Sequence, residues 1–391
     1  MASLLVTASS VIASPEDGFT RVLSPGYVRM ENGVIVDVGE GRPGGAPDVE
    51  LDGGTLAPGL VDLQVNGYYG VDMVDADQGG WRTVVSRLPE TGVTSFLPTF
   101  ITAPVEALAE ALRRTRDLLP ALPENTTRVL GVHLEGPFLS EKRKGAHNAA
   151  YLTDPTPEAI GALLETGLVK LVTLAPERNG ALEAVRTLVA NGVLVSVGHS
   201  DATAGQVAAA ADAGARKVTH IFNAQSGVHH RDPGVAVQAL ADTRLSPGLI
   251  LDLHHVSAPA CRLVFQAAAG RVVLVTDAAA SAGMPPGTYD LGGEPIEMPA
   301  EGPPLRADGT IAGSALRLDE AIANAVRIGV DPVTAVDAAT RVPADLIGRP
   351  DLGRVAPGAA ADLVWLDEGH RARATWIAGH EVYSRDRRGD A

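Results

Sequence analysis

The chain contains a series of short apolar runs, rich in Val, Leu and Ile, each of which ends in polar residues. Near-continuous apolar runs of this length are typical of strands that are buried on both faces, as in a parallel sheet. We count eight such runs and expect strands at 60–66, 93–99, 129–135, 170–177, 193–199, 217–223, 249–255 and 272–277.

Segments rich in Ala and Leu separate most of these runs and have helical character. Pro104 and Pro157 lie where a first helical turn tolerates proline, and Gly192 and Gly214 lie where a helix ends. Strands that alternate with helices predict an α/β fold, the (β/α)8 TIM-like barrel. The alternative is an open doubly wound sheet, but no G-x-G-x-x-G follows the first run. We expect helices at 104–119, 157–165, 181–190, 202–213, 259–268, 316–328 and 332–347.

The two ends of the chain depart from this pattern. Residues 1–57 and 358–391 carry short strand-like runs, and neither end has enough residues for a core of its own. We therefore expect them to pair into a small β-sandwich domain beside a barrel domain of residues 58–357. The Gly- and Pro-rich stretch 283–309 is expected to form a long loop or hairpin that could act as a lid. The strands expected in the ends are 4–12, 27–30, 34–38, 361–366 and 374–377.

Composition narrows the classes of function. The net charge of −15 disfavours nucleic acid and anionic membranes as partners. Cys261 is the single cysteine, which excludes an intrachain disulfide and a cysteine-based metal site. No apolar run approaches the roughly 20 residues of a membrane span, and the first basic residue is Arg21, unlike a signal peptide. We expect a cytoplasmic protein.

Several polar residues lie at the predicted strand ends, which face the active-site mouth of a barrel. One carboxylate and two imidazoles from three strands would suit a divalent metal ion and leave a position open for water. Any single histidine could be a hydrogen-bonded core residue, but the joint pattern favours a site. The strand-end residues are Gln64, Asn66, Glu135, His199, His220, His255 and Asp277.

Asp277 could be a general base or merely a helix N-cap. It follows the most apolar of the predicted strands, where a charge without a role would be costly, and this favours catalysis. Two basic segments, 141–148 and 229–231, interrupt an acidic sequence. Lys142 and Lys144 are compatible with ordinary solvated surface, whereas Arg231, before Asp-Pro-Gly, offers a guanidinium suited to a phosphate.

Taken together, these motifs resemble the amidohydrolase superfamily and, within it, the N-acetylglucosamine-6-phosphate deacetylases. The His-Leu-Glu-Gly-Pro-Phe block is the most specific, and the tail 353–364 is shared by the wider superfamily. The matching segments are Ala-Pro-Gly-Leu-Val-Asp-Leu-Gln-Val-Asn-Gly (57–67), His-Leu-Glu-Gly-Pro-Phe (133–138), Lys-Gly-Ala-His-Asn (144–148), Gly-His-Ser (198–200), Thr-His-Ile-Phe-Asn-Ala (219–224), Arg-Asp-Pro-Gly (231–234), Val-Thr-Asp-Ala (275–278) and Gly-Ser-Ala-Leu (313–316).

The resemblance implies a reaction: hydrolytic deacetylation of N-acetyl-D-glucosamine 6-phosphate to D-glucosamine 6-phosphate and acetate by a metal-activated water. It implies that Glu135, His199 and His220 bind one divalent ion per subunit, zinc before iron, manganese or cobalt. Asp277 would be the general base and then the acid, and His255 would polarise the acetyl carbonyl.

The resemblance also implies a homodimer, in which Arg231 reaches the site of the neighbouring subunit. The residues that it places at the substrate are Gln64, Ala146, His147, Asn223, Ala224, Arg231, His255, Ile311, Ala312 and Gly313.

Three departures from the family pattern bear on the reaction. Gln64 and Asn66 occupy the place of a His-x-His pair, which suggests a mononuclear site. Gln225 stands where relatives usually have Met, and Ala279 where Thr is common. The alternatives are a deacetylase of N-acetylgalactosamine 6-phosphate or of an unphosphorylated sugar, a catalytically inactive assembly protein, and a cyclic-amide hydrolase.

Overall fold

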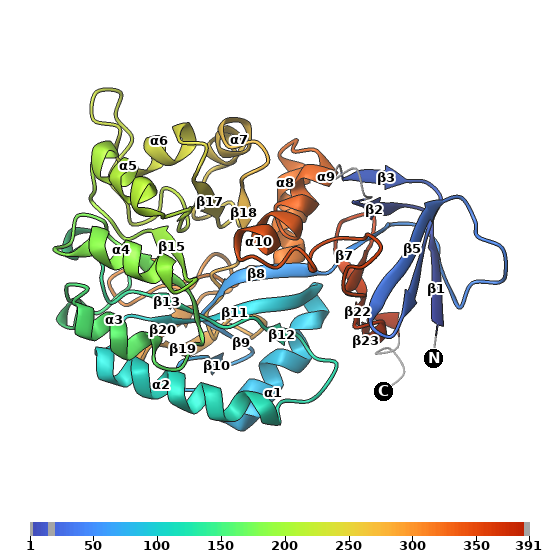
Figure 1. Ribbon diagram of the computed structural model, residues 1–391, viewed down its shortest axis with the longest axis horizontal. Helices are drawn as coiled ribbons and strands as arrows, with labels where there is room; N and C mark the ends of the chain where they lie inside the picture. The colour runs from blue at the N-terminus through green and yellow to red at the C-terminus, as the bar shows by residue number, and fades with distance from the viewer. Residues whose placement is uncertain (1–2, 15–19, 387–391) are drawn as a thin grey trace.

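A curled parallel sheet forms the centre of the molecule in this computed structural model, which describes residues 3–14 and 20–386. Its strands follow one another in sequence order around the barrel, and β12 lies beside β11 (Figure 1). The ring closes between β18 and β8 through a bridge from Val65 to Ala278 and a hydrogen bond from the Asp277 amide to the Gln64 carbonyl. The strands are β8 (Leu60–Val65), β11 (Val93–Ile101), β12 (Arg128–Val129), β13 (Val132–Glu135), β14 (Val169–Leu174), β15 (Leu194–Val197), β16 (Lys217–Val218), β17 (Ser246–Leu249) and β18 (Val273–Leu274).

The expected strands are present, but the later ones are short, with only two residues in β16 and in β18. The expectation for the seventh strand was wrong in position: β17 is Ser246–Leu249, not 249–255. Pro247 and Gly248 mask the strand in the sequence pattern, while the apolar residues 249–251 continue past its end.

Helices surround the barrel on its outside (Figure 1). The expected ones are confirmed, except that 332–347 is two helices, because Pro343 has no N–H to donate to the carbonyl of Ala339. Helices α1 and α6 were not expected from the sequence. The α-helices are α1 (Gln78–Arg87), α2 (Val105–Leu118), α3 (Pro157–Leu164), α4 (Ala181–Ala190), α5 (Ala204–Ala213), α6 (Gly234–Ala241), α7 (Ala258–Ala267), α8 (Leu318–Arg327), α9 (Pro332–Asp337) and α10 (Arg341–Leu346). Short 3-10 turns occur at Leu88–Thr91, Leu119–Ala121, Glu141–Arg143 and Ala149–Tyr151.

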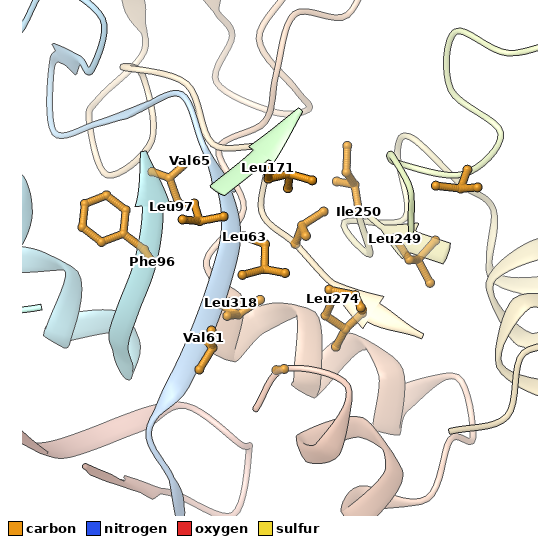
Figure 2. Packing of buried hydrophobic residues seen from close by; sticks show 14 of the residues in the cluster. Val61, Leu63, Val65, Phe96, Leu97, Leu171, Leu249, Ile250, Leu274 and Leu318 are labelled. Atoms are coloured by element: carbon orange, nitrogen blue, oxygen red, sulfur yellow. The ribbon is translucent and has the colours of Figure 1, made fainter. Parts of the chain in front are cut away.

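A continuous apolar cluster joins the barrel strands to these helices. Figure 2 shows Leu63 of β8 and Leu274 of β18 beside Leu318 of α8, all three fully buried. Burial of side chains of this size stabilises a fold by about 1.5–3 kcal/mol each. Apolar packing against the helices therefore stabilises the strands on the outside of the barrel, and polar groups can occupy the inside.

Two further sheets form a small β-sandwich from both ends of the chain (Figure 1). One has the order β5-β4-β1-β6, and the other, β23-β22-β21-β7-β2-β3, combines strands from the two ends. A separate apolar cluster contains residues from both ends, such as Val28 and Trp376. The strands are β1 (Ser3–Ala8), β2 (Val11–Ala13), β3 (Arg21–Leu23), β4 (Gly26–Glu31), β5 (Val34–Glu40), β6 (Val49–Leu51), β7 (Thr55–Pro58), β21 (Leu363–Leu366), β22 (Ala372–Ile377) and β23 (His380–Ser384).

The predicted fold class is therefore confirmed, while the domain limits at 57/58 and 357/358 remain a prediction. The stretch 283–309 contains the expected hairpin, formed by β19 (Gly287–Leu291) and β20 (Glu294–Met298). A smaller two-stranded pair consists of β9 (Gly67–Tyr68) and β10 (Val71–Asp72). No helix in the described ranges has the length and hydrophobicity of a membrane span.

Candidate active site

Glu135, His199 and His220 meet at the carboxyl end of the barrel strands. Glu135 ends β13, and the two histidines follow β15 and β16. Nε2 of His220 lies 2.9 Å from Oε1 of Glu135, Nε2 of His199 lies 3.4 Å from the same oxygen, and the two nitrogens are 3.1 Å apart. All three side chains are buried.

This trio has the chemistry of a metal site. Its three ligand atoms lie within 4.8 Å of one another, and no other such group of three exists in the part of the chain that is described. Nδ1 of His199 lies 2.9 Å from the carbonyl oxygen of Arg143, which can only accept, so a proton is on Nδ1 and Nε2 is the nitrogen that a metal ion could use. Two tetrahedral ligands at about 2.1 Å from an ion are themselves about 3.4 Å apart, close to the spacing seen here.

Charge also favours a cation at this point. Burial alone would raise the pKa of Glu135, but hydrogen bonds and the charges of His199 and His220 hold it well below its usual range. Burial lowers the pKa of His220, and its hydrogen bond to Glu135 more than reverses this. The carboxylate is thus ionised beside two imidazoles, a donor set that fits a divalent ion.

Asp277 lies near the trio, three residues after β18, and shares the amide of Gln64 with Glu135. Its Oδ1 accepts hydrogen bonds from the amide nitrogens of Gln64, at 2.9 Å, and Asn66, at 2.7 Å. Gln64 also donates to Oε1 of Glu135 at 3.1 Å. Burial and then the negative charge of Glu135 raise the pKa of Asp277. Gln64, which does not line the cavity, therefore bridges the two carboxylates, and Asn66, which does line it, holds Asp277 in place.

The backbone at three of these positions is strained. His199, His220 and Asp277 have φ values of +47°, +25° and +52°, in the left-handed region that non-glycine residues seldom adopt. A strand cannot continue through such a residue. The short strands and the inward turn of the three side chains thus have the same local cause.

A cavity of about 370 Å³ opens over the trio and contains most of the residues expected at the substrate. His147 makes a 2.8 Å contact from Nδ1 to the Thr102 hydroxyl, and Leu291 of the hairpin adds one wall. The predicted residues that line the cavity are Asn66, Glu135, Ala146, His147, His199, His220, Asn223, Ala224, His255, Asp277, Ile311 and Gly313.

Three expected residues lie elsewhere. Gln64 is buried beneath the cavity, and Ala312 is buried in a small apolar cluster with Leu291. Arg231 is exposed on the loop after His220 and does not line the cavity of its own chain in the described structure.

The imidazole of His255 is held by a residue that the sequence analysis missed. Nδ1 of His255 lies 2.6 Å from Oδ2 of Asp252, three residues earlier in the loop between β17 and α7. The Asp-x-x-His spacing could have revealed this pair. We expected a strand at 249–255, however, which placed Asp252 in the middle of a strand and not in a loop that reaches the site.

A line of hydrogen bonds crosses the barrel interior below the trio. His133 contacts Thr99 from Nδ1 at 3.2 Å and Thr173 from Nε2 at 2.8 Å. Thr173 contacts Thr219 at 2.8 Å, which contacts Ser196 at 2.6 Å. Burial lowers the pKa of His133 to about 3, so the ring is neutral. This polar chain links the strands on which the metal-site residues end.

Comparison with known families decides the affiliation of the chain. Residues 55–382 match the amidohydrolase family. The chain belongs to the amidohydrolase family. Among curated relatives, the N-acetylgalactosamine-6-phosphate deacetylase of Escherichia coli O157:H7 is 37% identical over 90% of this chain and 93% of its own. The N-acetylglucosamine-6-phosphate deacetylase of Danio rerio is 36% identical over 86% of each.

Solved structures agree with this affiliation. A mutant N-acetyl-D-glucosamine-6-phosphate deacetylase from Mycobacterium smegmatis, in complex with N-acetyl-D-glucosamine-6-phosphate, is similar with a TM-score of 0.92. It shares 35% sequence identity with this amidohydrolase, and the match covers 98% of this chain and 100% of the other.

Gln225 and Ala279, the two other departures from the family pattern, are both buried near the site of this amidohydrolase. Gln225 is buried and closes the loop after His220: its amide donates to the Thr219 carbonyl and its oxygen accepts from the Phe222 amide. Ala279 is buried beside Gly313. Neither side chain lines the cavity, so their direct effect on sugar choice is expected to be small.

Proposed function

We propose that this amidohydrolase hydrolyses the acetamide of N-acetyl-D-glucosamine 6-phosphate to D-glucosamine 6-phosphate and acetate. The observation that carries the proposal is a buried carboxylate, Asp277, next to a Glu–His–His donor set in one cavity. The names of the relatives supply the substrate class.

We propose that Glu135, His199 and His220 hold one divalent ion, with zinc as the native metal and iron, manganese and cobalt as the alternatives for metal analysis to exclude. Such an ion supplies Lewis acidity, which makes water nucleophilic near neutral pH and polarises a carbonyl. Metal binding requires an ionised carboxylate and an unprotonated ring nitrogen: Glu135 is ionised, and the contact of the Arg143 carbonyl with Nδ1 leaves Nε2 of His199 for the ion.

Asp277 is proposed to move the proton. Its carboxylate takes a proton from the attacking water and later gives it to the sugar nitrogen, so that the C–N bond breaks and the amine leaves neutral. The raised pKa of Asp277 suits this double role, because a stronger base accepts the first proton more readily. The amides of Gln64 and Asn66 fix the position of its Oδ1.

His255 is proposed to donate from Nε2 to the acetyl oxygen as negative charge develops there. His147, Asn223 and the backbone at Ala224 and Ile311 to Gly313 are proposed to hold the sugar phosphate. Arg231 is proposed to bind the phosphate in the cavity of a second subunit, because it is exposed and lies outside its own cavity. The proposed enzyme is a cytoplasmic homodimer.

The test is acetate release from N-acetylglucosamine 6-phosphate, N-acetylgalactosamine 6-phosphate and unphosphorylated N-acetylglucosamine, with metal-loaded and chelated protein. We expect fast, chelator-sensitive release from the gluco phosphate. Faster release from the galacto phosphate would replace the substrate by its epimer, a choice that the Escherichia coli relative makes worth testing. No release from any sugar by metal-loaded protein would overturn the proposed function.

Complementation tests the subunit exchange of Arg231. Arg231→Ala and Asp277→Asn are each expected to be nearly inactive as pure proteins. A mixed dimer would contain one complete site, with Asp277 from one chain and Arg231 from the other. Random co-assembly should therefore recover about a quarter of the wild-type activity, since half of the dimers are mixed and each has one of two sites. If mixing the Arg231→Ala and Asp277→Asn chains restores no activity, Arg231 does not act in the neighbouring site.

A further inference from the structure

Asp252 is a buried carboxylate whose three hydrogen bonds all converge on one loop. Its Oδ1 accepts from the backbone amides of His254 and His255, each at 2.8 Å. Its Oδ2 contacts Nδ1 of His255 at 2.6 Å. Both side chains are largely shielded from solvent, at 10% exposure for Asp252 and 6% for His255.

The protonation pattern follows from this geometry. Burial alone would raise the pKa of Asp252, but its hydrogen bonds, led by that from His255, bring the pKa below its ordinary value. An ionised carboxylate can only accept hydrogen bonds, so the proton of this contact belongs to Nδ1 of His255. The ring lines the cavity, and Nε2 is the nitrogen left for a ligand.

We infer that Asp252 is a positioning residue, which fixes the orientation of the His255 ring and holds a proton on its Nδ1. The carboxylate also balances the positive charge of the ring when Nε2 carries the second proton that it donates. The donation to an acetyl oxygen rests on the function proposed above; the fixed proton does not. The other groups that act on the pair are the thiol of Cys261 on α7 and the carboxylate of Asp277 after β18. The second of these carries negative charge when ionised, and the charge of His255 in turn lowers its pKa.

A purely structural role is the competing explanation. Asp252 also caps two backbone amides next to Leu253, which has a φ of +65°. Asp252→Asn separates the two roles. The asparagine oxygen can still accept from the amides of His254 and His255, but its NH2 group then faces Nδ1 and donates to it. In this variant the loop conformation is kept, and the proton of the His255 ring moves from Nδ1 to Nε2.

Nuclear magnetic resonance of ¹⁵N-labelled histidines reads the proton directly, with His255→Gln to assign the signal among the 10 histidines. In the wild-type protein we expect the proton on Nδ1 of His255, and in Asp252→Asn on Nε2. An unprotonated Nδ1 in the wild type, or an Nδ1 that stays protonated in the variant, would overturn the inference. The wild-type spectrum decides by itself if the variant does not fold.

Kinetics measure the consequence. Asp252→Asn should lower kcat by about 10- to 100-fold, as loss of a supporting partner typically does, with KM changed by less than about threefold. The matched control is Asp242→Asn at the other end of β17, where the carboxylate accepts from the amide and side chain of Arg244. The control should keep kcat within about twofold.

An unchanged kcat in Asp252→Asn beside an active wild type would overturn the catalytic consequence and leave Asp252 a loop-shaping residue. An inactive wild type would instead refute the proposed function, and the position of the ring proton would still decide whether Asp252 fixes His255.

Discussion

The interior of the barrel and the interior of the end sandwich are built on opposite principles. The sandwich encloses an apolar cluster that contains Trp376, Met30 and Leu363. The barrel interior contains the polar chain through His133 and, above it, the buried carboxylates of Glu135 and Asp277. Burial of these polar groups costs free energy, which is offset by the apolar packing between the outside of the barrel and the helices.

This difference assigns stability and chemistry to separate parts of the molecule. The stabilisation from apolar burial is not directional and depends mainly on the apolar area removed from water. A buried polar network loses much more when one partner is removed, because the remaining partner keeps its desolvation cost. Substitutions in the sandwich should therefore change stability without changing chemistry, whereas substitutions in the barrel interior should change the chemistry, the pH dependence of stability, or both.

The largest effect is expected from Asp277→Asn. Asparagine can keep the contacts with the amides of Gln64 and Asn66 but cannot take a proton. We expect kcat to fall by about 10³- to 10⁴-fold, the upper range for general acid–base catalysis, with metal content and thermal stability unchanged. An active variant with full metal content would remove Asp277 from the proton transfer.

Trp376→Ala tests the other region. The side chain is buried in the sandwich, and its loss should lower the free energy of unfolding by about 3–5 kcal/mol. Denaturant unfolding measures this, and kcat per folded molecule should stay within about twofold. Val36→Ala, at a half-exposed position on β5, is the matched control and should cost less than about 0.5 kcal/mol. A fall in kcat comparable to that of Asp277→Asn would show that the two regions are coupled.

A pH-dependent effect of intermediate size is expected inside the barrel. Burial raises the pKa of Asp62 from 3.8 to about 7. The folded protein then binds this proton more tightly than the unfolded chain, so the stability it contributes is full below about pH 4 and is lost as the pH rises to about 7. The loss is at most about 4 kcal/mol.

Asp62→Asn should remove that slope, since asparagine does not titrate and its oxygen can accept from the Thr276 hydroxyl, as Asp62 does at 2.6 Å. Unfolding free energies of the two proteins between pH 4 and 8 provide the measurement. If the unfolding free energies of the wild type and of Asp62→Asn change with pH in parallel, Asp62 does not titrate in this range. The sandwich variant Val36→Ala should follow the wild-type slope.

The sequence predicted the barrel, the sandwich and the metal-site trio because each leaves a local pattern. A strand buried on both faces produces an apolar run, and the polar residue that ends it produces a ligand candidate. Glu135, His199 and His220 are all of this kind. Their meeting point could be inferred because all parallel strands end at the same edge of the barrel.

The misses have physical causes as well. Helix α1 contains Gly79 and Gly80, and α6 begins at Gly234 after a proline, so neither has the composition of a strong helix. Asp252 was missed because its role depends on a contact across a turn, which apolar periodicity does not report. The reach of Arg231 into a second subunit stays a prediction, because it depends on an assembly that no pattern within one chain determines.

The six-stranded sheet has a consequence for how the protein is made. Strand β7, at Thr55–Pro58, pairs with β21, at Leu363–Leu366, so its partner is synthesised roughly 300 residues later. At about 5–20 residues per second, a ribosome takes about 15–60 s to reach it. During that time the edge of β7 has no partner from the far end of the chain, and the barrel can assemble first. Chaperones that cover exposed strand edges should therefore matter for this protein from the synthesis of β7 until β21 has been made.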